Sequence, residues 1–395
     1  MGMTGWTPAG LLLALTEFLS ILQFLGGNAP ILLEIRLQSF SSWFGSQPAP
    51  LLGMDIGSSG IRLAELGLGR DGQLALEHCA FEPIDRDWIV DGTIEKFDPV
   101  ADALRRVVKR SGTRTRLAAM ALPTSAVITR KIILPAGLPD AELEAQVEIE
   151  ANQYIPFSLD EVSLDFCVVG PAPSGAQEVE VLIAASRREK VQDRQGLAEA
   201  AGLKPVIVDV ESFAARMAAG RLVDALPLGR SDALVALFEI GDLATSLQVL
   251  KGTEVVYERD QPFGSFQLIQ HIVRQYGLAA DEAEQRLRSG ELPEDFDTQV
   301  QRPFVDGLAQ DLARALQFFF TSTPHNKVDH LLLAGAAAAL PGLTAAVSAH
   351  SSFPSSVADP FQGMQIATTV RERRLQREAP GYLVACGLAM RRFAR

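Results

Sequence analysis

From residue 51 onward, short apolar runs alternate with amphipathic stretches. Residues 51–57, LLGMDIG, predict a buried strand, and three small residues separate it from a second apolar run at 61–66. Residues 98–109 instead place apolar side chains at helical spacing, as do residues 143–154. Strands and helices that alternate in this way predict a mixed α/β fold.

The pattern of the first hairpin returns about 185 residues later. Residues 233–241, ALVALFEIG, are again an apolar strand that ends in an acid-x-Gly turn, and another strand, LQVL, follows. Two hairpins of one kind at this separation predict two lobes of similar topology with a cleft between them. Other strands are predicted at 117–122, 127–134, 179–184 and 205–210, with a helix at 189–202.

The N-terminal stretch departs from this pattern. Residues 10–25 are almost entirely apolar, with Glu17 beside a thin polar stripe. Two interpretations stay open: a helix in or on a membrane, or an extension that results from a misassigned start codon. No Lys or Arg precedes Arg36, which argues against a signal peptide and would leave the following chain in the cytoplasm if the helix inserted. Residues 41–50 predict a Ser/Gly/Pro linker.

Composition and charge narrow the class of function. The chain has 395 residues, 47% of them hydrophobic and 21% charged, as expected for a folded protein of two lobes. Its net charge of −12 and scattered basic residues argue against a nucleic-acid partner. Cys79, Cys167 and Cys386 are isolated in apolar contexts, which predicts buried, reduced thiols and neither a disulfide nor a zinc site.

The first hairpin has the residues that a phosphate site needs. Backbone N–H groups of the turn at Gly57, Ser58 and Ser59 can cradle phosphate oxygens, while the Asp55 carboxylate holds a magnesium ion through water. Arg62 can approach the same phosphate. An ordinary hairpin turn is the alternative interpretation, because turns of this type are common.

Two further segments favour the phosphate interpretation. Glu239 and Gly241 form a second loop of the same kind. Residues 330–342, HLLLAGAAAALPG, predict a strand that enters a Gly/Ala turn and then a helix. Such a turn allows the backbone to approach a base or a sugar closely, whereas close packing of helix on strand is the alternative role of Gly335.

The order of these three segments resembles the superfamily of actin, heat-shock proteins and sugar kinases, and longer stretches resemble the PilM family of type IV pilus assembly. The resemblance implies an α/β, two-lobed, actin-like (ribonuclease-H-like) ATPase fold with a small subdomain inserted into the first lobe, as in the cell-division protein FtsA. It implies a first lobe at 50–212 plus 370–395, an insertion at 122–176 and a second lobe at 213–369, after an extension at 1–49. The stretches concerned are LLGMDIGSSGIRLAEL, PTSAVITRKIILPAG, EIEANQYIPFSLDEVSLDF, IVDVESFAAR, QYGLAADEAEQRLRSGELPEDF and QFFFTSTPHNKVDHLLLAG.

The resemblance also implies a partner. Members of the family are held at the bacterial inner membrane by the short cytoplasmic N-terminal segment of the membrane protein PilN, so we expect a cytoplasmic, membrane-peripheral protein that also meets other proteins of the pilus platform. We expect an apolar and acidic groove for this peptide between the first lobe and the insertion. Plain core packing is the alternative for the last two of its candidate residues, which are Val127, Ile128, Ile133, Gln146, Ile149, Gln153, Tyr154 and Phe157.

ATP and magnesium are the cofactors that the resemblance implies, with Asp209 and Glu211 as further residues near the nucleotide. Three positions depart from the family pattern. Glu239 stands in place of Asp, Gly264 and Ser265 stand in place of Gly-Gly, and Ala336 follows Gly335 in place of a second Gly. These changes predict weakened ATP binding and at most weak hydrolysis.

Two other functions remain as alternatives. A small-molecule kinase of the same superfamily needs a catalytic base, and only Asp209 and Glu211 suit that role, at a position expected to connect the lobes. An FtsA-like membrane tether carries an amphipathic helix at its C-terminus, whereas this sequence ends with GYLVACGLAMRRFAR, an expected final helix of the first lobe.

Overall fold

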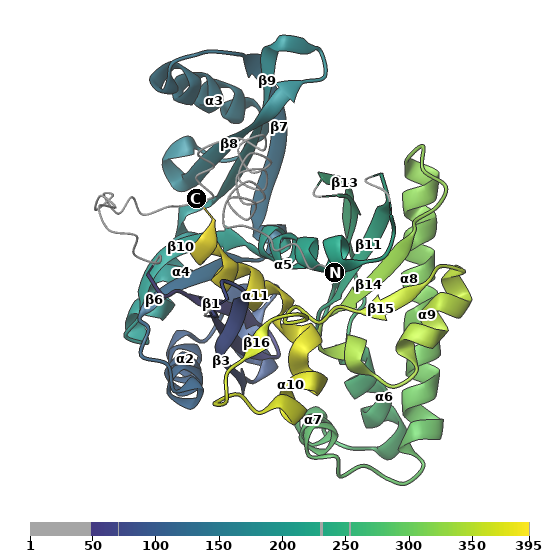
Figure 1. Cartoon of the computed structure of the whole chain (residues 1–395). Coiled ribbons are helices and arrows are strands. Elements are labelled where there is room, and N and C mark those ends of the chain that lie inside the picture. The colour runs from purple at the N-terminus through teal and green to yellow at the C-terminus, as the bar shows by residue number, and fades with distance from the viewer. Residues whose placement is uncertain (1–48, 70, 230–231, 253, 395) are drawn as a thin grey trace, which may run out of the picture.

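The computed structural model describes residues 49–394 except 70, 230–231 and 253 (Figure 1). The helix expected at 10–25 lies outside these residues, as does most of the expected linker at 41–50. In the described part of the chain, no helix is both long and apolar enough to cross a membrane.

A six-stranded sheet forms the centre of the first lobe, in the order β10-β6-β1-β2-β3-β16. Strand β1 pairs antiparallel with β2 and parallel with β6, so the expected hairpin lies in the middle of the sheet. The strands are β1 (Leu52–Gly57), β2 (Gly60–Leu68), β3 (Leu74–Pro83), β6 (Leu117–Leu122), β10 (Lys204–Val210) and β16 (Gln365–Ile366). Strands β4 (Ile89–Val90) and β5 (Thr93–Ile94) pair with each other in a separate two-stranded sheet.

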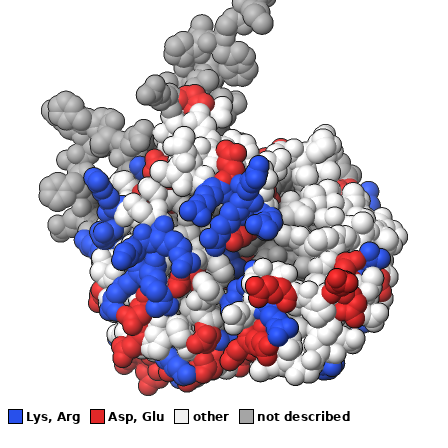
Figure 2. Space-filling view, turned by 90° about the horizontal axis from the view of Figure 1, so that it is seen from below, with Lys and Arg blue, Asp and Glu red and all other residues white. Residues whose placement is uncertain are grey.

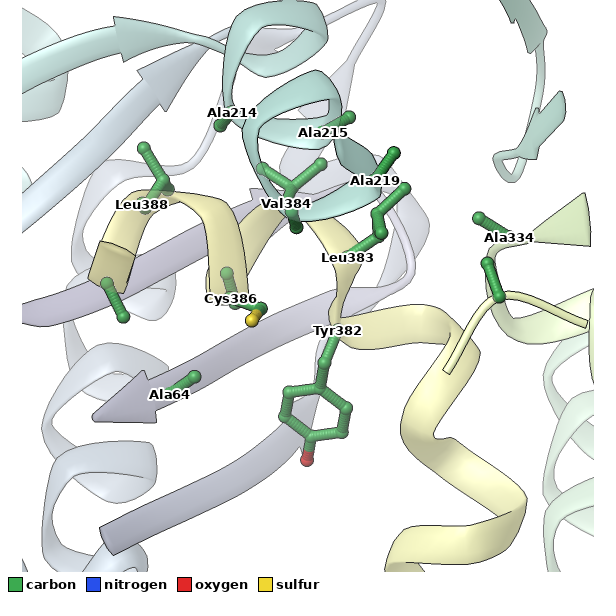
Figure 3. Packing of buried hydrophobic residues seen from close by; sticks show 14 of the residues in the cluster. Ala64, Ala214, Ala215, Ala219, Ala334, Tyr382, Leu383, Val384, Cys386 and Leu388 are labelled. Atoms are coloured by element: carbon green, nitrogen blue, oxygen red, sulfur yellow. The ribbon is translucent and has the colours of Figure 1, made fainter. Parts of the chain in front are cut away.

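Helices cover both faces of this sheet because its strands are apolar on both sides. On one face, α2 (Phe97–Ser111) and α4 (Arg188–Ala200) pack on alternate residues of β1, such as Met54. On the other face lie α5 (Glu211–Ala225) and α11 (Leu383–Met390), and small alanines of α5 let the two helices pack closely (Figure 3). The short α10 (Glu372–Glu378) precedes α11.

A small subdomain leaves the first lobe after β6, as expected, and stands at the top of Figure 1. Its antiparallel sheet has the order β7-β9-β8, and α3 packs on one face through Val147 and Ala151. The long strand β9 runs on to Arg187 and directly into α4, past the boundary predicted at 176. The elements are β7 (Val127–Pro135), α3 (Asp140–Tyr154), β8 (Val162–Ala172) and β9 (Gly175–Arg187).

The second lobe repeats the pairing of the first around the sheet β13-β12-β11-β14-β15. Strand β11 pairs antiparallel with β12 and parallel with β14, as β1 does with β2 and β6, so the predicted repeat of the hairpin is confirmed. Its elements are β11 (Leu234–Ile240), β12 (Thr245–Lys251), β13 (Glu254–Gln261), α6 (Phe266–Tyr276), α7 (Ala280–Ser289), α8 (Arg302–Ser322), β14 (His330–Ala334), α9 (Leu343–Ser351) and β15 (Ser355–Val357).

The two lobes share one apolar core around α5 and α11. Leu237 and Leu332 of the second lobe belong to the same buried cluster as Ala215 and Val384. Strand β16 also pairs with β3 of the first lobe, although its residues fall within the range predicted for the second lobe. The connection between the lobes is therefore broad and apolar on this side.

The three cysteines are buried to different degrees. Cys386 of α11 is fully buried, as predicted, and burial raises the pKa of its thiol to about 12. The prediction was wrong for Cys79 of β3 and Cys167 of β8, which are only partly buried.

Candidate functional site

The two acid-x-Gly loops, far apart in sequence, meet between the lobes. The Ser58 hydroxyl donates a hydrogen bond of 3.1 Å to Oδ2 of Asp242, and the Ser265 hydroxyl donates one of 3.2 Å to Oδ1 of the same carboxylate. Asp55 stands opposite Arg62 in the register of the first hairpin. The structure thus brings together the first loop, the second loop and the segment at Gly264 and Ser265.

The Gly/Ala turn after β14 converges on the same place. Gly335 has φ +90, and a Cβ atom there would lie 2.1 Å from the carbonyl oxygen of Ile240. A Cβ atom on Gly264 would lie 2.4 Å from the carbonyl oxygen of Asp242. The backbone of the second loop therefore leaves no room for a side chain at either glycine, while Ala336 beside Gly335 is exposed.

Three carboxylates, those of Asp55, Glu211 and Glu239, interact electrostatically between the lobes, and all have raised pKa values. Burial, with the negative charge of Asp55, raises the pKa of Glu211 to about 8, against the opposing effect of Arg194. Burial also raises the pKa of Asp55 itself, and that of Glu239, which Asp55 and Glu211 raise further. A bound cation would lower all three pKa values, so the site is suited to a positively charged ligand.

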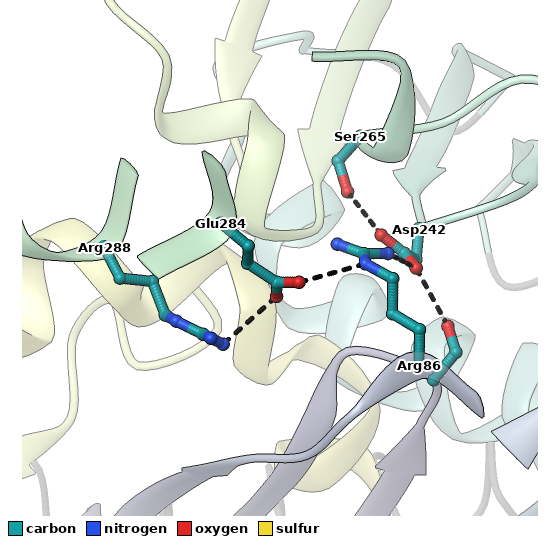
Figure 4. Close-up of polar contacts among 6 residues, drawn as sticks. Arg86, Asp242, Ser265, Glu284 and Arg288 are labelled. Atoms are coloured by element: carbon teal, nitrogen blue, oxygen red, sulfur yellow. Dashed lines mark hydrogen bonds and ion pairs between the residues drawn. The ribbon is translucent and has the colours of Figure 1, made fainter. Parts of the chain in front are cut away.

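Arg86, which sequence reasoning missed, connects the lobes (Figure 4). Its guanidinium forms an ion pair with Asp242, donates from Nε to Glu284 of α7 at 3.1 Å, and stacks 4.5 Å from the ring centre of Phe266. Arg288 also binds Glu284. No local pattern around Arg86 marks it in the sequence, because its partners lie more than 150 residues away.

Arg194 of α4 is a second residue that was missed. It is 1% exposed, its Nη1 has no hydrogen-bond partner among the described residues, and its charge lowers the pKa values of Asp55 and Glu211. A signal was present in the sequence: Arg194 occupies an inward-facing position of the helix between Val191 and Leu197. A cation at a core position indicates a nearby anion.

Asp209 lies apart from the other acids. It is fully buried, its Oδ2 accepts a hydrogen bond of 2.6 Å from Arg391, and its Oδ1 accepts one from the backbone N–H of Val210. This ion pair ties β10 to the end of α11. The structure therefore brings Glu211 to the interlobe site and places Asp209 in a structural contact.

A separate cavity of about 340 Å³ opens at the base of the inserted subdomain. It is mostly apolar, and the ring of Phe157 forms one wall with the Arg187 guanidinium 4.2 Å from its centre. Two of the eight residues predicted for the peptide groove, Ile128 and Phe157, line it. The full lining is Ser125, Ala126, Ile128, Ile155, Pro156, Phe157, Val162, Ala185, Ser186, Arg187 and Lys190.

The other predicted groove residues lie on different surfaces. Ile133 is 51% exposed on the outer face of β7, and Ile149 is 65% exposed on the outer face of α3. Tyr154 is 43% exposed beneath Arg130 and is therefore not part of the core. Gln146 and Gln153 lie on the same helix as Tyr154, and Val127 packs beside β10 and α5. The charged residues that line the cavity are Arg187 and Lys190, and none of its lining residues is acidic.

Comparison with known proteins identifies the family. A family model described as type IV pilus assembly protein PilM matches residues 53–393. The chain belongs to the PilM family. Among solved structures, the PilM–PilN type IV pilus biogenesis complex matches with a TM-score of 0.72 at 28% identity, over 87% of this chain and 98% of that one.

A second solved structure supports the fold at lower similarity. The ethanolamine utilization protein EutJ from Carboxydothermus hydrogenoformans matches with a TM-score of 0.50 at 16% identity, over 96% of this chain and 98% of that one. The predicted actin-like ATPase fold is confirmed by these matches and by the repeated lobe topology. The match to the PilM family model extends over both lobes and the inserted subdomain.

Proposed function

We propose that the chain is a scaffold of the type IV pilus inner-membrane platform that binds the N-terminal cytoplasmic peptide of a PilN-type protein. The cavity at the base of the inserted subdomain carries this proposal. It combines apolar walls, which suit a few side chains of a short peptide, with two cations at its edge. The similar PilM is known in complex with PilN. Attachment through such a peptide would hold the chain at the cytoplasmic side of the inner membrane, next to other platform proteins.

We propose ATP with Mg²⁺ as the ligand of the interlobe site. The residues fit the group: the carboxylates of Asp55, Glu211 and Glu239 interact electrostatically between the lobes, and a bound cation would favour their ionised forms. Among the described residues no cluster of three or more His, Cys, Asp or Glu forms a metal site of its own, so the nucleotide phosphates and water would complete the coordination of Mg²⁺.

The nucleotide has a defined role in this proposal. Asp55 and Glu239 would orient Mg²⁺ through water, and Arg62 and Arg194 would balance the charge of the site. The bound nucleotide would supply contacts to both lobes and so fix the angle between them. Peptide binding remains the primary activity, and hydrolysis is weak at most.

Titration of the PilN-type N-terminal peptide from the same organism into the full chain tests the scaffold function. Phe157→Ala removes one wall of the cavity and is expected to weaken binding by about tenfold or more, because the loss of a buried aromatic anchor costs about 2 kcal/mol. Ile149→Ser on the exposed face of α3 is the matched control, with unchanged affinity expected. Absence of binding to the native chain, or equal loss in both variants at unchanged thermal stability, would refute the proposal.

A further inference from the structure

Exposed basic side chains gather on one face of the first lobe, and none of them lines the cavity at the inserted subdomain. Figure 2 shows this face from below, where Lys and Arg form broad groups. Arg106, Lys109 and Arg110 of α2, and Arg114 just beyond it, are all exposed. Such a concentration of positive charge is unusual in a chain with a net charge of −12.

Helix α10 extends the same face. Its exposed cations are Arg373, Arg374 and Arg377, and Arg371, directly before the helix, is exposed as well. Hydrogen bonds connect α2, and the segment just before α10, to the same strand, β3. Arg110 of α2 donates to the backbone carbonyl oxygen of Phe81 at 2.8 Å, and the hydroxyl of Thr369, just before α10, donates to the backbone carbonyl oxygen of Glu77 at 3.2 Å. We call these two sets of cations, from α2 and α10, the basic face.

The carboxylates of this region neutralise only part of its charge. Glu82 binds both Arg106 and Arg110, and Glu378 binds Arg374. In contrast, Lys109, Arg373 and Arg377 make no ion pair with any described residue. Their charge is available to an external anion.

The chemistry of the basic face distinguishes between partners. Protein interfaces depend on large apolar or aromatic anchors, and among the exposed large apolar residues of the described chain only Phe97, the first residue of α2, belongs to α2 or α10. Binding of single-stranded nucleic acid uses exposed aromatic rings for stacking, and neither α2 beyond its first residue nor α10 carries one. A layer of anionic headgroups needs only a broad set of cations.

We infer that the basic face binds the anionic phospholipid surface of a membrane. Each Lys or Arg near such a surface increases partitioning about fivefold, so a few cations suffice for reversible association. The arginine side chains suit lipid phosphates, which they can bind through two N–H groups at once. This inference does not rest on the proposed function, because none of its residues lies at the cavity or the interlobe site.

Cosedimentation with vesicles tests the inference on the full chain. Binding is measured with two kinds of vesicle, one of equal parts phosphatidylglycerol and phosphatidylcholine and one of phosphatidylcholine alone. The ratio of the two is compared because the apolar residues 10–25 could bind either kind of vesicle whatever its charge. Replacing Lys109, Arg373 and Arg377 by Gln should lower this ratio by a factor on the order of 100. The matched control replaces two arginines and one lysine of the second lobe, Arg302, Arg314 and Lys327, which are also exposed, and should change it by about twofold.

Several results would overturn the inference. These are equal binding of the native chain to both kinds of vesicle, an equal decrease in the two triple variants, or no decrease in the first. Displacement of the chain from anionic vesicles by duplex DNA at an equal phosphate concentration would identify nucleic acid as the preferred polyanion. Loss of vesicle binding in high salt, with the difference between the two variants preserved at low salt, supports the inference.

Discussion

Arg86 of the first lobe reaches across to Asp242 of the second and binds it as an ion pair. The Asp242 side chain is 6% exposed and that of Arg86 is 22% exposed, so water screens this contact only in part. The hydroxyl groups of Ser58 and Ser265 donate to the same carboxylate, and Arg86 also binds Glu284. Polar contacts between the lobes therefore concentrate on Asp242.

Removal of this cation should destabilise the fold. Arg86→Gln leaves the Asp242 carboxylate largely buried without its cation, and we expect a loss of about 1–3 kcal/mol in the free energy of unfolding. Urea denaturation measures the loss. Arg105→Gln is the control, because Arg105 forms an exposed pair with Asp102 and should cost less than about 0.5 kcal/mol. Equal losses in the two variants would show that the interlobe ion pair stabilises the fold no more than an exposed ion pair does.

The departures at the nucleotide site predict weak ATP binding that substitution can improve. Glu239→Asp combined with Ala336→Gly restores the family pattern at two positions, and should tighten ATP·Mg²⁺ binding by about tenfold, or 1.4 kcal/mol. Asp55→Ala should abolish it. Calorimetry on the full chain measures each constant. A micromolar or tighter constant for the native chain that is lost in Asp55→Ala would contradict weakened binding.

Local patterns predicted the parts of the site that lie at strand ends. The hairpin at Asp55 and its repeat at Glu239 could be recognised because the apolar run, the acid and the glycine are adjacent in sequence. Arg86 could not be recognised in the sequence, since its role arises only when the folded lobes bring Asp242 beside it. Asp209 was misleading for the same reason: its partner, Arg391, comes from the far end of the chain.

The inserted subdomain shows a similar limit. The strand predicted at 127–134 is β7, which buries Ile132 and exposes Ile133. Sequence proximity could not determine which face borders the cavity, because that depends on how β9 continues into α4. Arg187 at that junction was therefore absent from the predicted groove.

Stability should depend on pH through Glu211. Its pKa of about 8 in the folded chain exceeds the ordinary value of 4.5, so the folded state retains a proton that the unfolded state has lost. This contribution to stability is complete below pH 4.5 and is lost as the pH rises towards 8, with a slope of at most about 1.4 kcal/mol per pH unit. Glu211→Gln should reduce the slope in denaturation measurements across this range. An unchanged slope would show that Glu211 is ionised in the folded chain.

The turn at Gly335 requires glycine both for its backbone conformation and for its close contact with the second loop. Gly335 and Gly342 both have positive φ, of +90 and +83, but only Gly335 has backbone where a Cβ atom would lie, 2.1 Å from the carbonyl oxygen of Ile240. Gly342→Ala should cost about 1–2 kcal/mol for the left-handed conformation alone. Gly335→Ala should cost about 1–3 kcal/mol more, because its backbone at φ +90 and ψ 163 is accessible almost only to glycine and because the second loop must move to relieve the overlap. Thermal or urea unfolding of both variants gives the difference. The second loop also carries Asp242, so the Gly335 variant should weaken ATP·Mg²⁺ binding as well, whereas the Gly342 variant should not. Equal effects of the two substitutions on stability and on binding would mean that the close contact with Ile240 is not what requires glycine at this turn.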